Sequence, residues 1–105
     1  MGYNWSPDKY IKLVEKSSDP VLQYYMKAEM DYITTKIENP KEKTFIDVGA
    51  GYGRVIPPLS EIAKQVITVE LDKKMLTELK HRGEQYPNVL VIIFIYLLIK
   101  LKHFI

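Results

Sequence analysis

The chain has no cysteine among its 105 residues. Disulfide bridges, thiol nucleophiles and thiolate metal sites are therefore excluded. It also lacks a large charge of one sign, since its formal net charge is +2 at pH 7 and no long basic tract is present. A mixed-charge surface of this kind gives no reason to expect nucleic acid as a partner.

Targeting, membrane and metal signals are missing as well. Met1–Trp5 has neither the basic region nor the apolar stretch of a signal peptide, which makes the cytoplasm the expected location. The longest apolar run, Val89–Ile99, has 11 residues, fewer than the ~18–20 that a membrane span needs, so we expect no membrane contact. His81 and His103 have no acidic partners at ligand spacing, and no metal site is expected.

A glycine-rich turn follows the first short apolar segment. Residues Thr44–Val48 have the β-branched and apolar composition of a buried parallel strand. Three glycines then stand at alternate positions, Gly49, Gly51 and Gly53, before a segment that can be helical. A strand, a glycine turn and a helix bring bare backbone N–H groups up to a ligand, and glycine leaves room for that ligand.

An acidic residue accompanies each of the first two predicted strands. Asp47 lies two residues before the first glycine, and Glu70 ends the next apolar run, Val66–Val69. Glu70 would thus lie at the carboxyl end of a strand, where open α/β sheets bind ligands, and could accept hydrogen bonds from both hydroxyls of a ribose. Each acid also has a structural alternative: Glu70 as a solvated strand-end residue and Asp47 as a cap of the glycine turn.

These two motifs together resemble the class I S-adenosylmethionine-dependent methyltransferases. The matching segments are Asp47–Arg54, which reads DVGAGYGR, and Val66–Asp72, which reads VITVELD. The likeness extends over roughly residues 44–93. It implies that S-adenosylmethionine is the cofactor and that the reaction is methyl transfer to an unknown acceptor. No catalytic residue can be named from it.

The resemblance also implies roles for individual residues. The acid matching Asp47 lies near the amino group of the methionine portion of the cofactor, and the residue matching Leu71 packs on the adenine. Leu71 could equally be buried in the sheet, Arg54 could meet a carboxylate or point to solvent, and Asp72 is better explained as a helix N-cap. The predicted cofactor-binding residues are Asp47, Gly49, Ala50, Gly51, Tyr52, Gly53, Glu70 and Leu71.

The expected fold is α/β: a Rossmann-like three-layer parallel sheet, incomplete with about three strands, preceded by two N-terminal helices. Ser6 and Asp19, each followed by proline, cap those helices. The second carries an apolar stripe from Leu22 to Ile37 that would pack on the sheet. Alternatively it is a lid whose aromatic side chains cover a ligand: Trp5, Tyr24 and Tyr25.

Two more helices are predicted between the strands. The first covers residues 54–64 with prolines tolerated in its first turn, and Val55, Leu59 and Ile62 face inward. The second covers residues 73–82, with Gly83 as its C′ residue. Its buried stripe consists of Met75, Leu76 and Leu79.

We expect three regions along the chain. Residues 1–40 form an N-terminal helical lid or extension, residues 41–93 a Rossmann-like cofactor-binding half-domain, and residues 94–105 an apolar tail. The tail departs from the methyltransferases because Ile92–Ile95 offers no polar group to an adenine. Either the chain is a truncated form of a longer enzyme with little activity, or the tail makes a new packing element. Its apolar surface predicts a homo-oligomer.

Two other classes of function stay open at this point. A nicotinamide-dependent oxidoreductase shares the order of strand, glycine turn, helix, strand and acid. Its usual glycine spacing is G-x-G-x-x-G, whereas Gly49, Gly51 and Gly53 give G-x-G-x-G. The second alternative is a non-catalytic interaction module that associates through its apolar tail.

Overall fold

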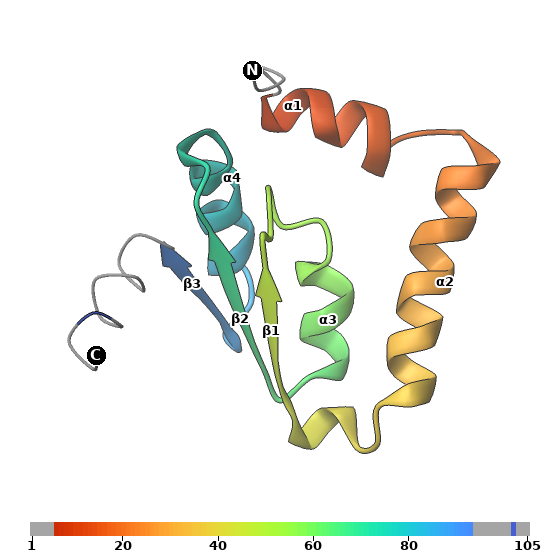
Figure 1. Ribbon diagram of the computed structural model, residues 1–105, viewed down its shortest axis with the longest axis vertical. Helices are drawn as coiled ribbons and strands as arrows, with labels where there is room; N and C mark the ends of the chain where they lie inside the picture. Colours follow the sequence, from red (N-terminus) through yellow and green to blue (C-terminus); the bar gives the residue numbers. More distant parts are fainter. Residues whose placement is uncertain (1–5, 94–101, 103–105) are drawn as a thin grey trace.

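The computed structural model describes residues 6–93 and Lys102 (Figure 1). The predicted tail at 94–105, apart from Lys102, lies outside the described residues, as do Trp5 and His103. Two helices open the chain, followed by alternating strands and helices, which confirms the predicted order. The elements are α1 (Pro7–Tyr10), α2 (Pro20–Lys36), β1 (Thr44–Val48), α3 (Ile56–Ile62), β2 (Gln65–Glu70), α4 (Lys73–Glu84) and β3 (Val89–Ile93).

Both predicted caps of the N-terminal helices are confirmed. The backbone N–H of Lys9 donates to Oγ of Ser6, 3.4 Å away, and that of Val21 donates to Oδ1 of Asp19 at 2.9 Å. A π-helical segment, Ile11–Glu15, continues α1. These caps satisfy N–H groups that have no intrahelical partner, so each helix begins at its cap.

The sheet consists of three parallel strands in the order β1-β2-β3. Its core lies between the sheet and α3 and α4, where the fully or nearly fully buried residues from the two helices meet. The predicted stripe of α4 is confirmed, and Leu59 of α3 is buried as predicted. The buried apolar side chains are Tyr52, Ile56, Leu59, Val66, Val69, Met75, Leu76 and Leu79.

The opposite face of the sheet is open within the described residues. The register places Ile46, Ile67 and Leu90 in one row across the three strands. Ile46 is 64% exposed and Leu90 48% exposed. Two consecutive right-handed crossovers in one direction put both connecting helices on the same face, and the described part therefore provides two layers of the Rossmann-like arrangement.

Helix α2 differs from the prediction that its apolar stripe packs on the sheet. None of its residues is buried, and Tyr25 is 66% exposed. Figure 1 shows α2 as the outer edge of the molecule, beyond α3. Ile33 of the stripe lines a cavity together with Phe45 and Asp47 of β1, so the stripe borders an open space beside the sheet and does not pack into the core.

The C-terminus of α4 also differs from the prediction. The helix continues through Gly83 to Glu84, so Gly83 is an interior residue and not the C′ residue. A Cβ added at Gly83 would lie 2.7 Å from Cγ2 of Val91 on β3. Glycine is therefore needed because α4 approaches β3 too closely for any side chain. Helix α3 is shorter than predicted, and its fully buried residue is Ile56.

Gly83→Ala tests this close approach. Alanine gains about 1 kcal/mol of helix propensity over glycine, whereas overpacking costs about 1–3 kcal/mol. Because the expected clash is with β3 across a rigid contact, we expect a net loss of about 1 kcal/mol in the free energy of unfolding, measured with urea.

Gly83→Ala should cost less stability in a Val91→Ala background than in the parent, because the methyl group that it would clash with is absent there. Lys80→Ala, at an exposed position of the same helix, is the control. A gain in stability from Gly83→Ala in the parent background would contradict the packing argument.

Candidate functional site

The glycine turn has two different structural tasks. All three glycines have positive φ, at 73° for Gly49, 62° for Gly51 and 95° for Gly53. A Cβ at Gly53 would lie 2.9 Å from Cδ1 of Ile56 and 3.1 Å from Cδ1 of Leu79, so this glycine allows close packing of the core. A Cβ at Gly49 or Gly51 would meet no heavy atom within 4 Å. The turn is therefore open to a ligand at its first two glycines.

The carboxylate of Glu70 holds the glycine turn to the end of β2. Its Oε1 accepts a hydrogen bond from the backbone N–H of Gly51 at 2.6 Å. Its Oε2 accepts from the backbone N–H groups of Leu71 and Asp72, each at 2.8 Å. A second link comes from Val69, whose carbonyl accepts from two N–H groups of the turn. The shape of the turn thus depends directly on Glu70.

Asp47 lies on β1 with its side chain toward the helices. Its Oδ2 is buried and has no hydrogen-bond partner among the described residues. Burial raises the pKa of the Asp47 carboxyl above its ordinary value, and the charge of Arg54 opposes that rise in pKa. The negative charges of Glu29 and Glu70 add to the rise. An unpaired buried carboxylate is unfavourable, so this group is suited to a cationic partner.

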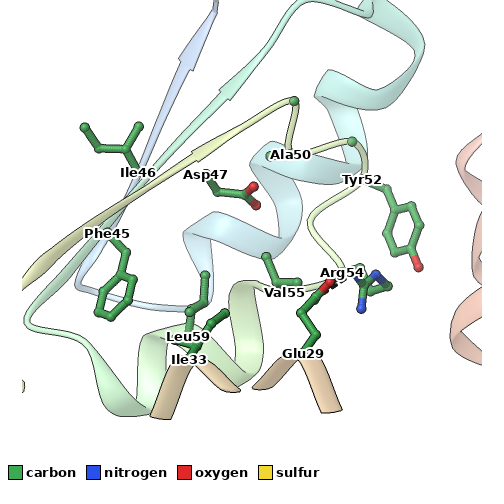
Figure 2. A pocket seen from close by; sticks show the side chains of 12 residues that line it. Glu29, Ile33, Phe45, Ile46, Asp47, Ala50, Tyr52, Arg54, Val55 and Leu59 are labelled. Carbon is green, nitrogen blue, oxygen red and sulfur yellow. Dashed lines mark hydrogen bonds and ion pairs between the residues drawn. The ribbon is translucent and has the colours of Figure 1, made fainter. Parts of the chain in front are cut away.

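A cavity of about 470 Å³ lies beside Asp47, between α2, β1, the glycine turn and α3. Figure 2 shows the Asp47 carboxylate directed from β1 toward the space next to Arg54 and Val55. Glu29 reaches the same cavity from α2 and binds Nη2 of Arg54, with Oε1 at 3.0 Å and Oε2 at 3.3 Å. Arg54 therefore meets a carboxylate, one of the two predicted alternatives.

Tyr52 of the glycine turn is held by a second arginine that the sequence did not point to. The guanidinium carbon of Arg82 lies 4.8 Å from the ring centroid of Tyr52. Two nitrogens of Arg82 donate to Glu15 at 2.9 and 2.8 Å, and Nε donates to Glu78 at 3.2 Å. The hydrogen bond with Glu15 raises the pKa of Arg82. The spacing of Glu78 and Arg82 is visible in the sequence, but the contact with Glu15 spans 67 positions and has no local signal.

The structure brings most of the predicted site residues together. Asp47, the glycine turn and Arg54 share one cavity, and Glu70 touches that turn. Leu71 is 54% exposed, which rules out its burial in the sheet. Oδ1 of Asp72 accepts from the N–H of Lys74 at 2.9 Å, which confirms Asp72 as the N-cap of α4. The ligand roles stay predictions.

Other kinds of site are not found in residues 6–93. This part of the chain contains no cluster of three or more side chains that could hold a metal ion. None of its helices is long and apolar enough to cross a membrane. His81 is exposed, as predicted.

A family model and curated relatives of this chain both concern the methylation of ribosomal RNA. The family model of the ribosomal RNA adenine dimethylases matches residues 24–94. A probable ribosomal RNA small subunit methyltransferase A from Methanosarcina acetivorans is 35% identical over 63 residues, covering 60% of this chain and 23% of that protein. A solved dimethyladenosine transferase from Plasmodium falciparum has a TM-score of 0.52 at 30% identity, covering 62% of this chain and 24% of the other.

A SAM dependent methyltransferase from Aquifex aeolicus has a TM-score of 0.60 at 21% identity, which shows the fold alone. It covers 85% of this chain and 47% of that one. The chain spans 23% and 24% of the two relatives named above. The predicted resemblance to class I S-adenosylmethionine-dependent methyltransferases is confirmed.

One prediction is wrong in the light of these matches. The small net charge led to the expectation that nucleic acid is no partner, whereas the matched family is defined by ribosomal RNA. The net charge sums the charges of this chain alone, and the chain corresponds to about a quarter of the length of the matched relatives. An RNA-binding surface elsewhere in such a protein leaves no trace in this sum.

Asp47→Asn tests the unpaired carboxylate without a ligand. Because burial raises the pKa of Asp47, the native state binds more protons than the unfolded state between pH 3.8 and that raised value. The parent should therefore lose stability as the pH rises through this window. We expect Asp47→Asn to be the more stable protein at pH 7 and to lose this advantage near pH 4.

The measurement is urea unfolding of both proteins between pH 4 and pH 8. Glu84→Gln removes one negative charge from an exposed position of α4 and is the matched control. If the stability difference between the parent and Asp47→Asn does not depend on pH, burial does not disfavour the charged form of Asp47.

Proposed function

Because the chain belongs to the ribosomal RNA adenine dimethylase family, we propose that it supplies the S-adenosylmethionine-binding part of an enzyme that methylates adenine in ribosomal RNA. The relatives act on ribosomal RNA according to their names. Ribosomal RNA is therefore the proposed methyl acceptor, which the sequence alone does not identify. A cytoplasmic location suits that acceptor.

The observation that carries this proposal is the unpartnered oxygen of Asp47 beside an open glycine turn. A buried polar atom without a hydrogen bond costs about 1–3 kcal/mol. The ammonium group of the methionine portion would satisfy Oδ2 of Asp47 and offset its burial. The positive-φ turn at Gly49 and Gly51 leaves space on its ligand side. These residues fit the cofactor that the family implies.

Glu70 would hold the ribose. A carboxylate has about four acceptor positions, and backbone N–H groups of Gly51, Leu71 and Asp72 occupy three of them. One ribose hydroxyl can therefore bind without displacing the backbone. Leu71 is exposed next to this carboxylate and would pack on the adenine. Ala50 and Tyr52 contribute the backbone between the glycines.

When bound, the cofactor supplies a methyl group on a sulfonium, which carries its own leaving group. What remains for the protein is to hold the acceptor in line with the methyl carbon. The residues of this chain bind and orient the cofactor, and none of the described residues is assigned to the acceptor. The helical lid proposed at residues 1–40 borders the cavity through Glu29 and Ile33 of α2.

Calorimetric titration with S-adenosylhomocysteine tests the proposal. We expect the parent to bind it and not to bind NAD. Glu70→Ala should weaken binding by about 2 kcal/mol, or roughly thirtyfold, because it removes one charge-assisted hydrogen bond. Gly51→Val should abolish binding because a branched side chain fills the space beside the turn.

Both variants also affect the turn itself, so a structural control is needed. Asp72→Ala removes the N-cap of α4, at about 1 kcal/mol of stability, without removing the proposed ribose contact. It should bind within twofold of the parent. If Glu70→Ala binds as tightly as Asp72→Ala, Glu70 does not hold the ribose.

The chain by itself should transfer methyl groups poorly to RNA. It matches about a quarter of its relatives, and no described residue positions an acceptor. The assay is transfer of a radiolabelled methyl group from S-adenosylmethionine to ribosomal RNA, with a full-length relative as the positive control. Turnover within tenfold of that relative would contradict this expectation.

A further inference from the structure

Two arginines contact the N-terminal helices, and they are bound in different ways. Arg82 uses three nitrogens, with two parallel hydrogen bonds to Glu15 and one to Glu78. Arg54 uses Nη2 alone for Glu29, and its other nitrogens have no hydrogen-bond partner within the described residues. A guanidinium has five N–H donors. Arg54 therefore keeps unused donors, whereas Arg82 is committed to its two carboxylates.

The Glu29–Arg54 ion pair is also more exposed to solvent than the Glu15–Arg82 ion pair, and we expect it to be the weaker of the two. The Arg54 side chain is 29% exposed and that of Glu29 is 44% exposed, whereas Arg82 is 15% exposed. Ion pairs in contact with water contribute little because solvent and salt screen them. A better placed carboxylate can therefore displace Glu29 from Arg54.

The cavity beside this pair has the charges to receive both ends of an amino acid. Asp47 presents an unpartnered carboxylate oxygen, and Arg54 presents a guanidinium on the lining of the same cavity. The charge of Arg54 lowers the pKa of Asp47 and that of Glu29 raises it, so the three groups interact across the cavity. An ammonium matches Asp47, and a carboxylate matches Arg54.

We propose that the Glu29–Arg54 ion pair is a latch that the amino-acid end of the cofactor opens. Arg54 leaves Glu29 and binds the carboxylate of the methionine portion, while Asp47 accepts its ammonium. No covalent bond changes. This inference rests on the proposed cofactor and assigns Arg54 as a binding residue and Glu29 as its competitor.

Opening the latch also frees α2. Among the described residues, the Glu29–Arg54 pair is the one side-chain ion pair between α2 and the glycine turn. No residue of α2 is buried, so little apolar packing resists a shift of this helix. Cofactor binding would therefore loosen the outer wall of the cavity.

Three ligands separate the contacts. S-adenosylmethionine carries both the ammonium and the carboxylate, decarboxylated S-adenosylmethionine lacks the carboxylate, and 5′-methylthioadenosine lacks the amino-acid end. Each is titrated by calorimetry into the full chain and into Arg54→Gln and Glu29→Gln. Glu61→Gln removes a negative charge from an exposed position of α3 and is the matched control for net charge.

The parent should bind S-adenosylmethionine about 10–100-fold more tightly than the decarboxylated ligand, the range of one charge-assisted hydrogen bond. Arg54→Gln should reduce this preference below about threefold. Glu29→Gln should tighten binding of S-adenosylmethionine by about 2–5-fold, the range of an exposed ion pair, and leave 5′-methylthioadenosine within twofold. Glu61→Gln should change none of these values by more than twofold.

The movement of α2 has its own readout because the chain has no cysteine. Spin labels on Tyr32→Cys and Lys80→Cys, both at exposed positions, report the distance between α2 and α4. S-adenosylmethionine should broaden or lengthen that distance, whereas 5′-methylthioadenosine should leave it unchanged. An identical distance distribution with both ligands overturns the release of α2.

The outcomes distinguish the latch from the proposed function. If the parent binds S-adenosylmethionine and its decarboxylated form equally well, Arg54 does not bind the carboxylate and the latch is overturned, while cofactor binding stands. If Glu29→Gln weakens binding of S-adenosylmethionine, Glu29 supports the ligand and does not compete with it. If none of the three ligands binds, the proposed function fails and the latch fails with it.

Discussion

Three backbone N–H groups converge on the single carboxylate of Glu70, and the site depends on that convergence. One comes from the glycine turn and two from the residues that follow β2. Glycines at positive φ have no side chain to hold them, so the turn takes its shape from these hydrogen bonds and from the carbonyl of Val69. Under the proposed function this carboxylate also accepts a hydrogen bond from a ribose, so the residue that shapes the turn would contact the ligand as well.

Two ion pairs join the N-terminal helices to the rest of the molecule, whereas the core is apolar. Helices α3 and α4 are held to the sheet by buried apolar side chains. The N-terminal segment meets the rest of the molecule through Glu15 with Arg82 and Glu29 with Arg54, and also through the ring of Tyr10 beside that of Tyr52. Apolar contacts vary little with small shifts in charge, whereas an ion pair can exchange one partner for another. The described part of the chain therefore combines apolar packing around the sheet with an exposed ion pair at Arg54 whose partner could be exchanged.

The sequence predicts the elements that local patterns control. The helix caps, the order of strand, glycine turn and helix, and the stripe of α4 follow from residue type and spacing, and the structure confirms them. Predictions fail where distant parts of the chain meet. Gly83 is predicted to end a helix, whereas the structure shows that glycine is needed there because β3 lies too close for a side chain. The apolar stripe of α2 is predicted to pack in the core. Periodicity identifies an apolar face of a helix, but it does not identify what packs against that face.

The site shows the same division. Asp47 and Glu70 can be found from their places at strand ends, whereas their partners cannot. Glu29 lies 25 positions from Arg54, and no local pattern links the two. The net charge of the chain likewise gives no indication of the ribosomal RNA that appears in the names of the matched family and relatives.

The strand order has a consequence for how this part of the protein forms. Each strand pairs with the strand before it, and the register joins Thr44 to Gln65 and Val66 to Val89. Every strand pairing therefore spans a single crossover helix and needs no later part of the chain. The sheet can grow from β1 outward in the order in which a ribosome delivers its strands, with each crossover helix packing as its strand arrives. A cofactor site built from the first two strands would thus be assembled before the third is needed.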